Sequence, residues 1–360
     1  MKIKKMISAN LEKFRAFINR HRLASLLITS ALGIATVANV AMALIGTPLP
    51  AIVQDIVVKK PDPVYYSPLT GLKAGKESDT TKPVTAIIIE NSPDARPQSG
   101  IKDAEIVYEA IAEGGITRFL ALYQQNKPTL IGPVRSVRSY HPDWIRPFDA
   151  SVAHVGGSAR ALKEIRGGNF RDIDQFFNDS AYWRASDRYA PHNVYTSFKR
   201  LDALNRQKKY TKSSPKPFER ADPTPAKKAT ASKVTIKVSS ELFNSSYTYN
   251  KKSNTYTRSQ GGALHKDREK GTISPTVVIA LKVNERTVME ETWRERIQTQ
   301  GTGQAVIFQN GQAIKATWKK STQNDQLSFT DSNGEKIALA RGQTWITAVP
   351  NGKGSVSWKK

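Results

Sequence analysis

The sequence predicts an α+β protein, in which an N-terminal membrane anchor precedes a mixed α/β first domain and a mainly antiparallel β second domain. Residues 23–46 form one long apolar segment. Residues 67–205 alternate short apolar runs with helical patterns, which is typical of α+β or mixed α/β domains. Residues 233–358 consist of short alternating runs separated by Asn-Gly pairs, which is typical of antiparallel hairpins.

The N-terminus has the pattern of a signal-anchor. Residues 1–22 carry seven basic side chains and one glutamate, directly before the apolar segment 23–46. That segment has about the 20 apolar residues that a bilayer core requires, and the positive-inside rule places the basic tail in the cytoplasm. We therefore expect a single-pass membrane protein whose domains are extracytoplasmic. Ala41-Met42-Ala43 fits a signal-peptidase site, so secretion after cleavage near Ala43 is the alternative.

Two proline-containing segments connect the predicted parts. Residues 47–66 contain four prolines and two lysines, and we expect them to form a stalk that proline stiffens. Residues 206–232 are rich in lysine, proline and serine, which indicates a linker between the two domains.

The chain is strongly basic. It carries 55 basic and 31 acidic residues, a net charge of +24, of which about +6 lies in residues 1–22. Such a charge suits teichoic-acid-like polymer, anionic lipid or nucleic acid. Of these partners we expect an anionic cell-envelope polymer or a small anionic ligand, and not nucleic acid. The alternative is that the charge only keeps a secreted domain soluble.

The first domain begins with three predicted strands, at residues 84–90, 105–112 and 117–123. The second and third are joined across Glu113-Gly114-Gly115, which is a plausible hairpin turn. We expect this hairpin to bring Glu113 close to Arg118. Further along, residues 148–155 read as a strand, residues 159–165 as a helix that stops at Gly167-Gly168, and residues 197–208 as a second helix.

A candidate anion site lies where the strand at 148–155 turns into the following helix. The turn contains Gly156, Gly157 and Ser158, and the N–H groups and dipole of a helix start favour an anion. Arg135 and Arg138, with Ser136 between them, could bind phosphate or carboxylate through bidentate forks. The alternative is that both arginines pair with acidic residues on a solvated face and the glycines only make a tight turn.

His154 and His192 are the candidates for general acid–base catalysis, because Gly-Gly-Ser follows the first closely and Asn193 follows the second. Glu113, at the hairpin loop, is the third catalytic candidate, and Arg118 and Asn193 join the binding candidates. A structural role, with the ring satisfied by backbone groups, is the alternative for either histidine. We expect Glu109 to neutralise an arginine such as Arg118 or Arg135.

The sequence predicts neither a metal centre nor a cofactor. The chain has no cysteine, which excludes disulfides, thiol catalysis and thiolate metal sites. No two of its five histidines have the short spacing of a local metal site.

Four motifs resemble the YerB-like family of bacterial lipoproteins. They are RPQSG at 96–100, EGGITRFLALY at 113–123, IGPVRSVRSY at 131–140 and APHNVYTS at 190–197. The resemblance covers most of the chain after about Ser67 and implies an N-terminal and a C-terminal module, neither with an assigned function. One departure is that a lipoprotein needs a cysteine to carry its lipid, and this chain has none.

Together these patterns predict a membrane-anchored extracytoplasmic protein whose first domain binds an anionic envelope component. One alternative is an envelope hydrolase or transferase that uses the same cleft. Another is a structural partner of an envelope complex that uses the β domain as its contact surface. The motifs combine glycine, proline or asparagine with charge, as loops at strand ends do, so we expect them to meet on one rim.

Overall fold

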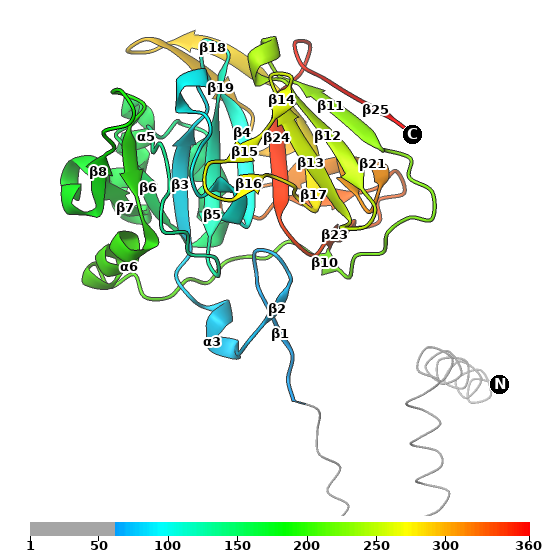
Figure 1. Cartoon of the computed structure of the whole chain (residues 1–360), viewed down its shortest axis with the longest axis horizontal. Coiled ribbons are helices and arrows are strands. Elements are labelled where there is room, and N and C mark those ends of the chain that lie inside the picture. Colours follow the sequence, from blue (N-terminus) through cyan, green and yellow to red (C-terminus); the bar gives the residue numbers. More distant parts are fainter. Residues whose placement is uncertain (1–61) are drawn as a thin grey trace, which may run out of the picture. The chain divides into compact units, whose positions relative to one another are not determined.

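A ten-stranded mixed sheet runs through residues 62–360, the part of the chain that this computed structural model describes (Figure 1). In spatial order its strands are β22 (Ser328–Thr330), β21 (Gln312–Lys320), β20 (Gly301–Gln309), β17 (Val277–Val283), β24 (Thr344–Pro350), β4 (Ile106–Glu113), β5 (Ile116–Tyr123), β3 (Thr85–Glu90), β6 (Ser151–His154) and β7 (Arg171–Asp174). The predicted tail, the anchor at 23–46, the cleavage site near Ala43 and most of the stalk lie outside these residues. Within 62–360, no helix is both long and apolar enough to cross a membrane.

The sheet contains strands from both segments that the sequence assigns to separate domains. β24 is parallel to β17 on one side and to β4 on the other, so it joins the N-terminal and C-terminal segments by backbone hydrogen bonds. Val64–Lys360 accordingly form one compact unit. The predicted linker at 206–232 runs against this unit, with Phe218 buried and β10 (Arg220–Ala221) paired to β23 (Leu339–Ala340).

A second, five-stranded sheet is antiparallel throughout. Its strands are β14 (Ala263–Leu264), β13 (Thr255–Gln260), β12 (Ser245–Asn250), β11 (Lys233–Lys237) and β25 (Ser355–Lys359). Val234, Ile236 and Tyr247 of this sheet share an apolar cluster with Val278 and Phe308 of the large sheet. Burial of these side chains holds the two sheets together.

The remaining elements are short. Four further pairs of strands are β1 (Tyr65–Tyr66) with β2 (Lys73–Ala74), β8 (Tyr182–Arg184) with β9 (Val194–Thr196), β15 (Lys266–Asp267) with β16 (Gly271–Thr272), and β18 (Glu285–Met289) with β19 (Trp293–Ile297). The α-helices are α3 (Glu77–Thr80), α4 (His141–Ile145), α5 (Ala159–Glu164) and α6 (Phe198–Gln207). The described unit is therefore rich in sheet and has few helices. It agrees with the predicted α+β fold at the level of fold class.

Both faces of the large sheet are covered. Along β3, Ile88 points into one apolar cluster, whereas Ile87 and Ile89 point into the other. Alternate residues of a strand face opposite sides of the sheet, so a run that is buried throughout needs cover on both sides. α4 contributes Trp144 to the first cluster, and α6 contributes Leu201 to the second.

Most predicted elements of the first segment are confirmed, with one shortened strand. β3, β4 and β5 lie where apolar runs predicted them, and Gly114 and Gly115 form the hairpin turn with positive φ angles of 57° and 78°. The strand predicted at 148–155 is restricted to β6 because Asp149 takes a left-handed conformation, at φ 48°, and ends the preceding turn. A left-handed residue cannot continue a strand.

The direction of the strands defines the edge that matters for the site. β3, β4, β6 and β7 all run the same way, and β5 runs against them. Their carboxyl ends therefore meet at one edge, which we call the carboxyl edge, and β5 starts there.

Candidate functional site

The carboxyl edge brings together most of the charged residues that the sequence singles out. Glu113 ends β4. Arg118, near the start of β5, lies opposite Glu90, the last residue of β3, in the register of the two strands. The segment carrying Arg135 lies between β3 and the turn after β6, since the Arg135 N–H donates to the Ile88 carbonyl and its carbonyl accepts from Val155. Residues far apart in the sequence thus share one rim.

Three arginines surround the Glu113 carboxylate. Arg294 Nη1 lies 2.6 Å from Oε1 and Arg118 Nη2 lies 3.4 Å from Oε2, while Arg138 donates its Nε–H to Oε1. We call Glu113, Arg118, Arg138 and Arg294 the arginine cluster. The arginine side chains are 6%, 10% and 17% exposed for Arg118, Arg138 and Arg294, and Glu113 is 28% exposed.

The arginine cluster carries more positive charge than its glutamate can neutralise. Glu291, 3.7 Å from Arg294 Nε, is about half exposed, so water weakens its effect on the charge of Arg294. Burial, with the like charge of Arg138, lowers the pKa of Arg118 to about 10. Burial opposes ionisation of Glu113, but its bond to Arg138 and the charge of Arg118 outweigh burial and bring its pKa below the usual value. An additional anion at this position would be stabilised by the excess charge.

Some donors of the cluster are also unused. Nε of Arg118 and Nε of Arg294 are buried and have no hydrogen-bond partner within the described residues. Other donors hold the arginines in place, because Arg118 Nη1 donates to the Ser136 carbonyl and Arg138 Nη1 to the Val137 carbonyl, both at 2.8 Å. Ser136 therefore takes part through its backbone.

A second charged group lies beside the cluster, around Glu90. This buried carboxylate has Arg135 Nε 3.1 Å from one oxygen and His192 Nδ1 3.0 Å from the other. The hydroxyl of Ser92 is 3.2 Å from the same ring nitrogen, whereas Nε2 of His192 lies 3.9 Å from Asp94. Arg135 and His192 thus share one carboxylate. Pairing of Arg135 with an acidic residue is what the alternative to anion binding expects, but this carboxylate is buried and does not lie on a solvated face.

His192 also forms part of the wall of a cavity of about 640 Å³, which we call the His192 pocket. Its lining includes three arginines and two aspartates, Arg96, Arg188, Arg268, Asp94 and Asp187, together with Tyr189. Arg188 links its own segment to the 94–97 segment of the lining, because it donates to the carbonyls of Asp94 and Pro97 at 2.8 and 2.6 Å. The loop that carries His192 is held by Asn193, whose amide accepts from Arg184 and donates to the carbonyls of Ala185 and Arg188.

The Gly156-Gly157-Ser158 turn has its own internal partners. The Gly156 N–H donates to the Asp174 carboxylate at 3.0 Å, and the Ser158 N–H donates to the Val137 carbonyl at 3.2 Å. His154 is fully buried, with Nδ1 2.8 Å from the Gly156 carbonyl and Nε2 3.0 Å from the Asp172 carboxylate. A carboxylate of the chain therefore occupies the place where the turn was predicted to bind an anion, and both ring nitrogens of His154 have acceptors.

Several residues of the site carried no local signal in the sequence. Arg294 reaches Glu113 from β19, 181 residues further along the chain. In the sequence Glu90 is only the end of a predicted strand, although its carboxylate lies 3.1 Å from Arg135 Nε and 3.0 Å from His192 Nδ1. Glu109 pairs with Arg258 at 2.7 Å and not with the arginines expected for it. Of the arginines that line the His192 pocket, Arg96 lies within one of the motifs, RPQSG, whereas Arg188 and Arg268 lie outside all four.

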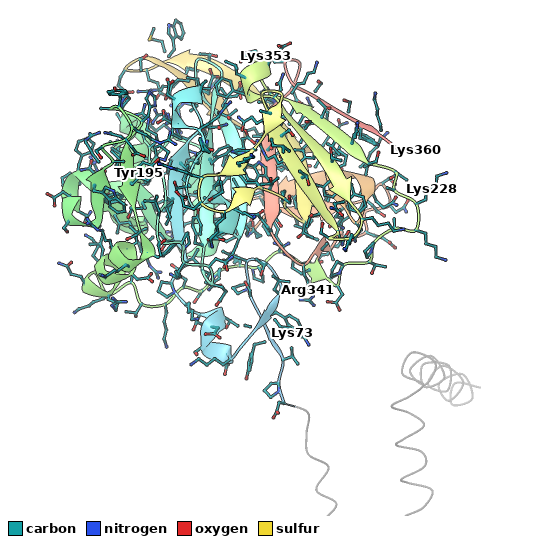
Figure 2. All side chains as sticks on the ribbon, viewed as in Figure 1. Lys73, Tyr195, Lys228, Arg341, Lys353 and Lys360 are labelled. Atoms are coloured by element: carbon teal, nitrogen blue, oxygen red, sulfur yellow. The ribbon has the colours of Figure 1, made fainter. Side chains whose placement is uncertain are left out.

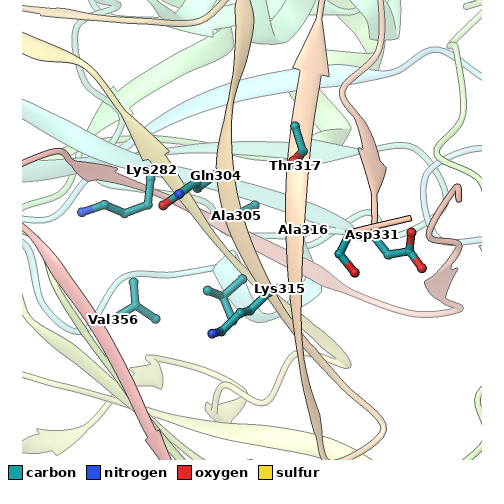
Figure 3. A pocket seen from close by; sticks show the side chains of 10 residues that line it. Lys282, Gln304, Ala305, Lys315, Ala316, Thr317, Asp331 and Val356 are labelled. Atoms are coloured by element: carbon teal, nitrogen blue, oxygen red, sulfur yellow. The ribbon is translucent and has the colours of Figure 1, made fainter. Parts of the chain in front are cut away.

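A further cavity lies among strands of the C-terminal segment. A cavity of about 450 Å³ is bounded by Lys282, Gln304, Lys315 and Val356, and contains no residue that the sequence proposed (Figure 3). Lys282 in its wall already donates to the carbonyls of Pro350 and Gly354, at 3.2 and 3.0 Å. Across residues 62–360, no three metal-ligating side chains gather in one place.

Basic side chains are spread widely over the described unit. Residues 1–61 hold nine basic and two acidic residues, which leaves 46 basic and 29 acidic ones on residues 62–360. Figure 2 shows Lys73, Lys228 and Lys353 at well separated places on the surface. The net charge alone therefore does not locate a binding site. The site has to be identified from the local geometry of the carboxyl edge.

Comparison with known proteins gives consistent relatives. Two family models match, the N-terminal and C-terminal domains of a protein of unknown function (DUF3048), at residues 69–211 and 234–346. The chain is 34% identical over 289 residues to "Putative lipoprotein YerB" of Bacillus subtilis, covering 79% of this chain and 86% of the relative. The crystal structure of YerB from Bacillus subtilis is similar with a TM-score of 0.73 and 31% identity, over 81% of this chain and 99% of that one.

Proposed function

Because the chain belongs to the DUF3048 family, whose two domains have no known function, we propose a role from its own geometry: it binds an anionic envelope component outside the cytoplasm. The arginine cluster is the observation that carries this proposal. Three partly buried guanidinium groups converge on one carboxylate and leave net positive charge at the carboxyl edge. Ligands of open α/β sheets bind beyond the carboxyl ends of the strands, which is where the cluster lies.

The chemistry of the cluster suits an oxyanion. Guanidinium groups are planar and present paired donors that match phosphate and carboxylate oxygens. The buried Nε atoms of Arg118 and Arg294 have lost water without gaining a partner among the described residues, which is unfavourable. The side chains of Arg294 and Glu113 are 17% and 28% exposed, so an anion approaches the cluster on their side, where its charge would offset the repulsion between the arginines.

The N-terminal sequence and the relative support an extracytoplasmic location. The basic tail and apolar segment at 1–46 have the pattern of a signal-anchor, and the relative in Bacillus subtilis is named a lipoprotein. Since this chain has no cysteine to carry a lipid, we propose a protein anchor. Protease added to intact cells should then remove residues 62–360 and leave a membrane-bound stub. Protection of those residues would contradict this location.

Binding of inorganic phosphate to the full chain tests the site, with calorimetry as the readout. Arg294→Gln should weaken binding by roughly 10-fold or more, since a hydrogen bond to a charged group contributes about 1.5–3 kcal/mol. Arg286→Gln is the matched control, because Arg286 lies exposed on the paired strand β18, outside the cluster, and the charge change is the same. Equal losses in both variants would show that only overall charge matters.

An envelope hydrolase or transferase is a second candidate, favoured by the position of His192. Its Nδ1 lies 3.2 Å from the Ser92 hydroxyl and 3.0 Å from the Glu90 carboxylate, and the ring lines a pocket that contains three arginines. A histidine beside a carboxylate, at the wall of a pocket that contains arginines, suits proton transfer to an anionic substrate. Hydrolysis of bis(p-nitrophenyl) phosphate by the unmodified chain tests this candidate. A rate that falls by about 100-fold or more in His192→Gln would support it. Absence of turnover in the unmodified chain would exclude that reaction.

A further inference from the structure

The arginine cluster and the His192 pocket lie on one continuous row of charged residues along the carboxyl edge. Arg118 of the cluster lies directly opposite Glu90 on the neighbouring strand. Glu90 in turn contacts His192 at 3.0 Å, and His192 lines the pocket. With neighbouring strands about 5 Å apart, the row from cluster to pocket extends on the order of 10–15 Å.

The two ends of this row have the same sign of charge. The cluster has three arginines for one central glutamate. The pocket wall has three arginines for two aspartates, and Glu269 lies 3.8 Å from Nε of Arg268; these three carboxylates are 39% to 80% exposed, so water screens them. Between the two ends, Arg135 offsets the charge of Glu90. The row therefore presents two positive sites joined by a nearly neutral segment.

We infer that the ligand is a polymer with repeated oxyanion groups, which occupies the arginine cluster and the His192 pocket at once. This rests on the proposed function and narrows it, because a single small anion can fill only one of the two sites. Once one charged group is bound, its covalent neighbour reaches the second site at a high effective concentration. A chain of phosphodiester or phosphoanhydride units carries such charges at intervals that fit this reach.

The inference predicts a dependence on polymer length. Inorganic phosphate, tripolyphosphate and long-chain polyphosphate are titrated against the full chain, with affinity expressed per phosphate group. Long chains should bind about 100-fold more tightly than inorganic phosphate, because linkage of two sites commonly contributes a factor of this size or more. Poly-glutamate, used in the same way, separates a requirement for phosphate from a requirement for any repeated anion.

Variants at the two ends should act differently. Arg294→Gln in the cluster should weaken phosphate and polyphosphate alike. Arg268→Gln in the pocket should weaken the long polymer by about 10-fold or more and the cluster-bound phosphate little, since only the polymer engages both sites. Arg268→Lys, which keeps the charge, should restore part of the loss. Arg286→Gln on β18 is again the control, and thermal unfolding of each variant verifies its fold.

The outcomes separate the two claims. If phosphate binding depends on Arg294 but affinity does not rise with length and Arg268→Gln behaves as the unmodified chain, the polymer inference is wrong and the proposed function stands. If neither phosphate nor polymer binding depends on Arg294, both fail. If Arg286→Gln weakens polymer binding as much as the other variants, the polymer binds through non-specific charge, which also overturns the inference.

Discussion

Arg258 and Glu109 form an ion pair that is completely shielded from solvent, with Nη2 2.7 Å from Oε2. The two residues are 149 positions apart and join β13 of the five-stranded sheet to β4 of the ten-stranded sheet. The indole N–H of Trp345 donates to the same carboxylate at 3.0 Å, and the guanidinium packs 4.5 Å from the centre of the Trp345 ring. The pair therefore fastens the C-terminal sheet to the strand that carries Glu113.

Glu109→Gln should destabilise the protein strongly, because it leaves the Arg258 charge buried without its counter-ion. Loss of one partner of a buried pair typically costs about 3–5 kcal/mol in the free energy of unfolding. Urea unfolding monitored by tryptophan fluorescence measures this change. Glu241→Gln, the same substitution at an exposed position, should change stability by no more than about 0.5 kcal/mol. A loss below about 1 kcal/mol for Glu109→Gln would mean that the pair is not needed to join the sheets.

Stability should fall in mild acid because two buried histidines are held neutral. His141 Nδ1 accepts from the Arg138 N–H at 2.9 Å, and His265 Nδ1 lies 3.0 Å from Arg258 Nη1, a group that can only donate. Burial, with the charge of nearby arginines, lowers the pKa of both well below the ordinary value. As pH falls below about 6.5, the unfolded chain takes up protons at these positions and the folded chain does not.

The free energy of unfolding should therefore decrease by about 1.4 kcal/mol per pH unit for each histidine below that pH. Urea unfolding between pH 7.5 and 5.5 gives the slope. His141→Asn keeps an acceptor for Arg138 and should reduce the slope by the share of one histidine. An identical slope in that variant would show that His141 is protonated in the folded state.

Gly157→Ala should destabilise the turn after β6 because the chain passes too close there for a side chain. A Cβ at this position would lie 2.5 Å from Val137 Cγ1 and 3.0 Å from the Val137 carbonyl oxygen. Overpacking of this kind costs about 1–3 kcal/mol. Gly167→Ala is the matched control, since a Cβ there meets no atom within 4 Å. Equal melting temperatures for the two variants would show that the segment at Val137 can move aside.

The elements that the sequence predicted well are those specified by local pattern. The β4–β5 hairpin follows from two alternating apolar runs and Gly114-Gly115, and it correctly brings Glu113 to Arg118. The turn at Asn310-Gly311 likewise makes a hairpin of β20 and β21, whereas Asn351-Gly352 connects β24 to β25, which lie in different sheets. These signals depend only on residues near each other in the chain.

The missed features all depend on residues far apart. Nothing near Arg294 distinguishes it from other charged residues of the β18–β19 hairpin, and only the fold brings it to Glu113. The parallel pairing of β24 with β4 unites the two halves in one sheet, yet neither strand encodes its partner. At the predicted anion site, Asp174 from β7 fills the turn with a carboxylate of the chain. Local pattern identified the donors there but not the acceptor that uses them.

Phosphate binding by Glu113→Gln tests the central claim most directly, with Arg294→Gln measured beside it. Glutamine preserves the shape of Glu113 but removes the one carboxylate at the centre of the three arginines. If the arginine cluster is an anion site, Glu113→Gln removes a negative charge that repels phosphate and competes for the arginines. The variant should then bind phosphate roughly 10-fold more tightly than the unmodified chain, which corresponds to about 1.4 kcal/mol in binding free energy. Arg294→Gln should bind more weakly. If phosphate binding is unchanged or weaker in Glu113→Gln while its melting temperature is retained, the cluster is a structural ion-pair network and the proposed function is wrong.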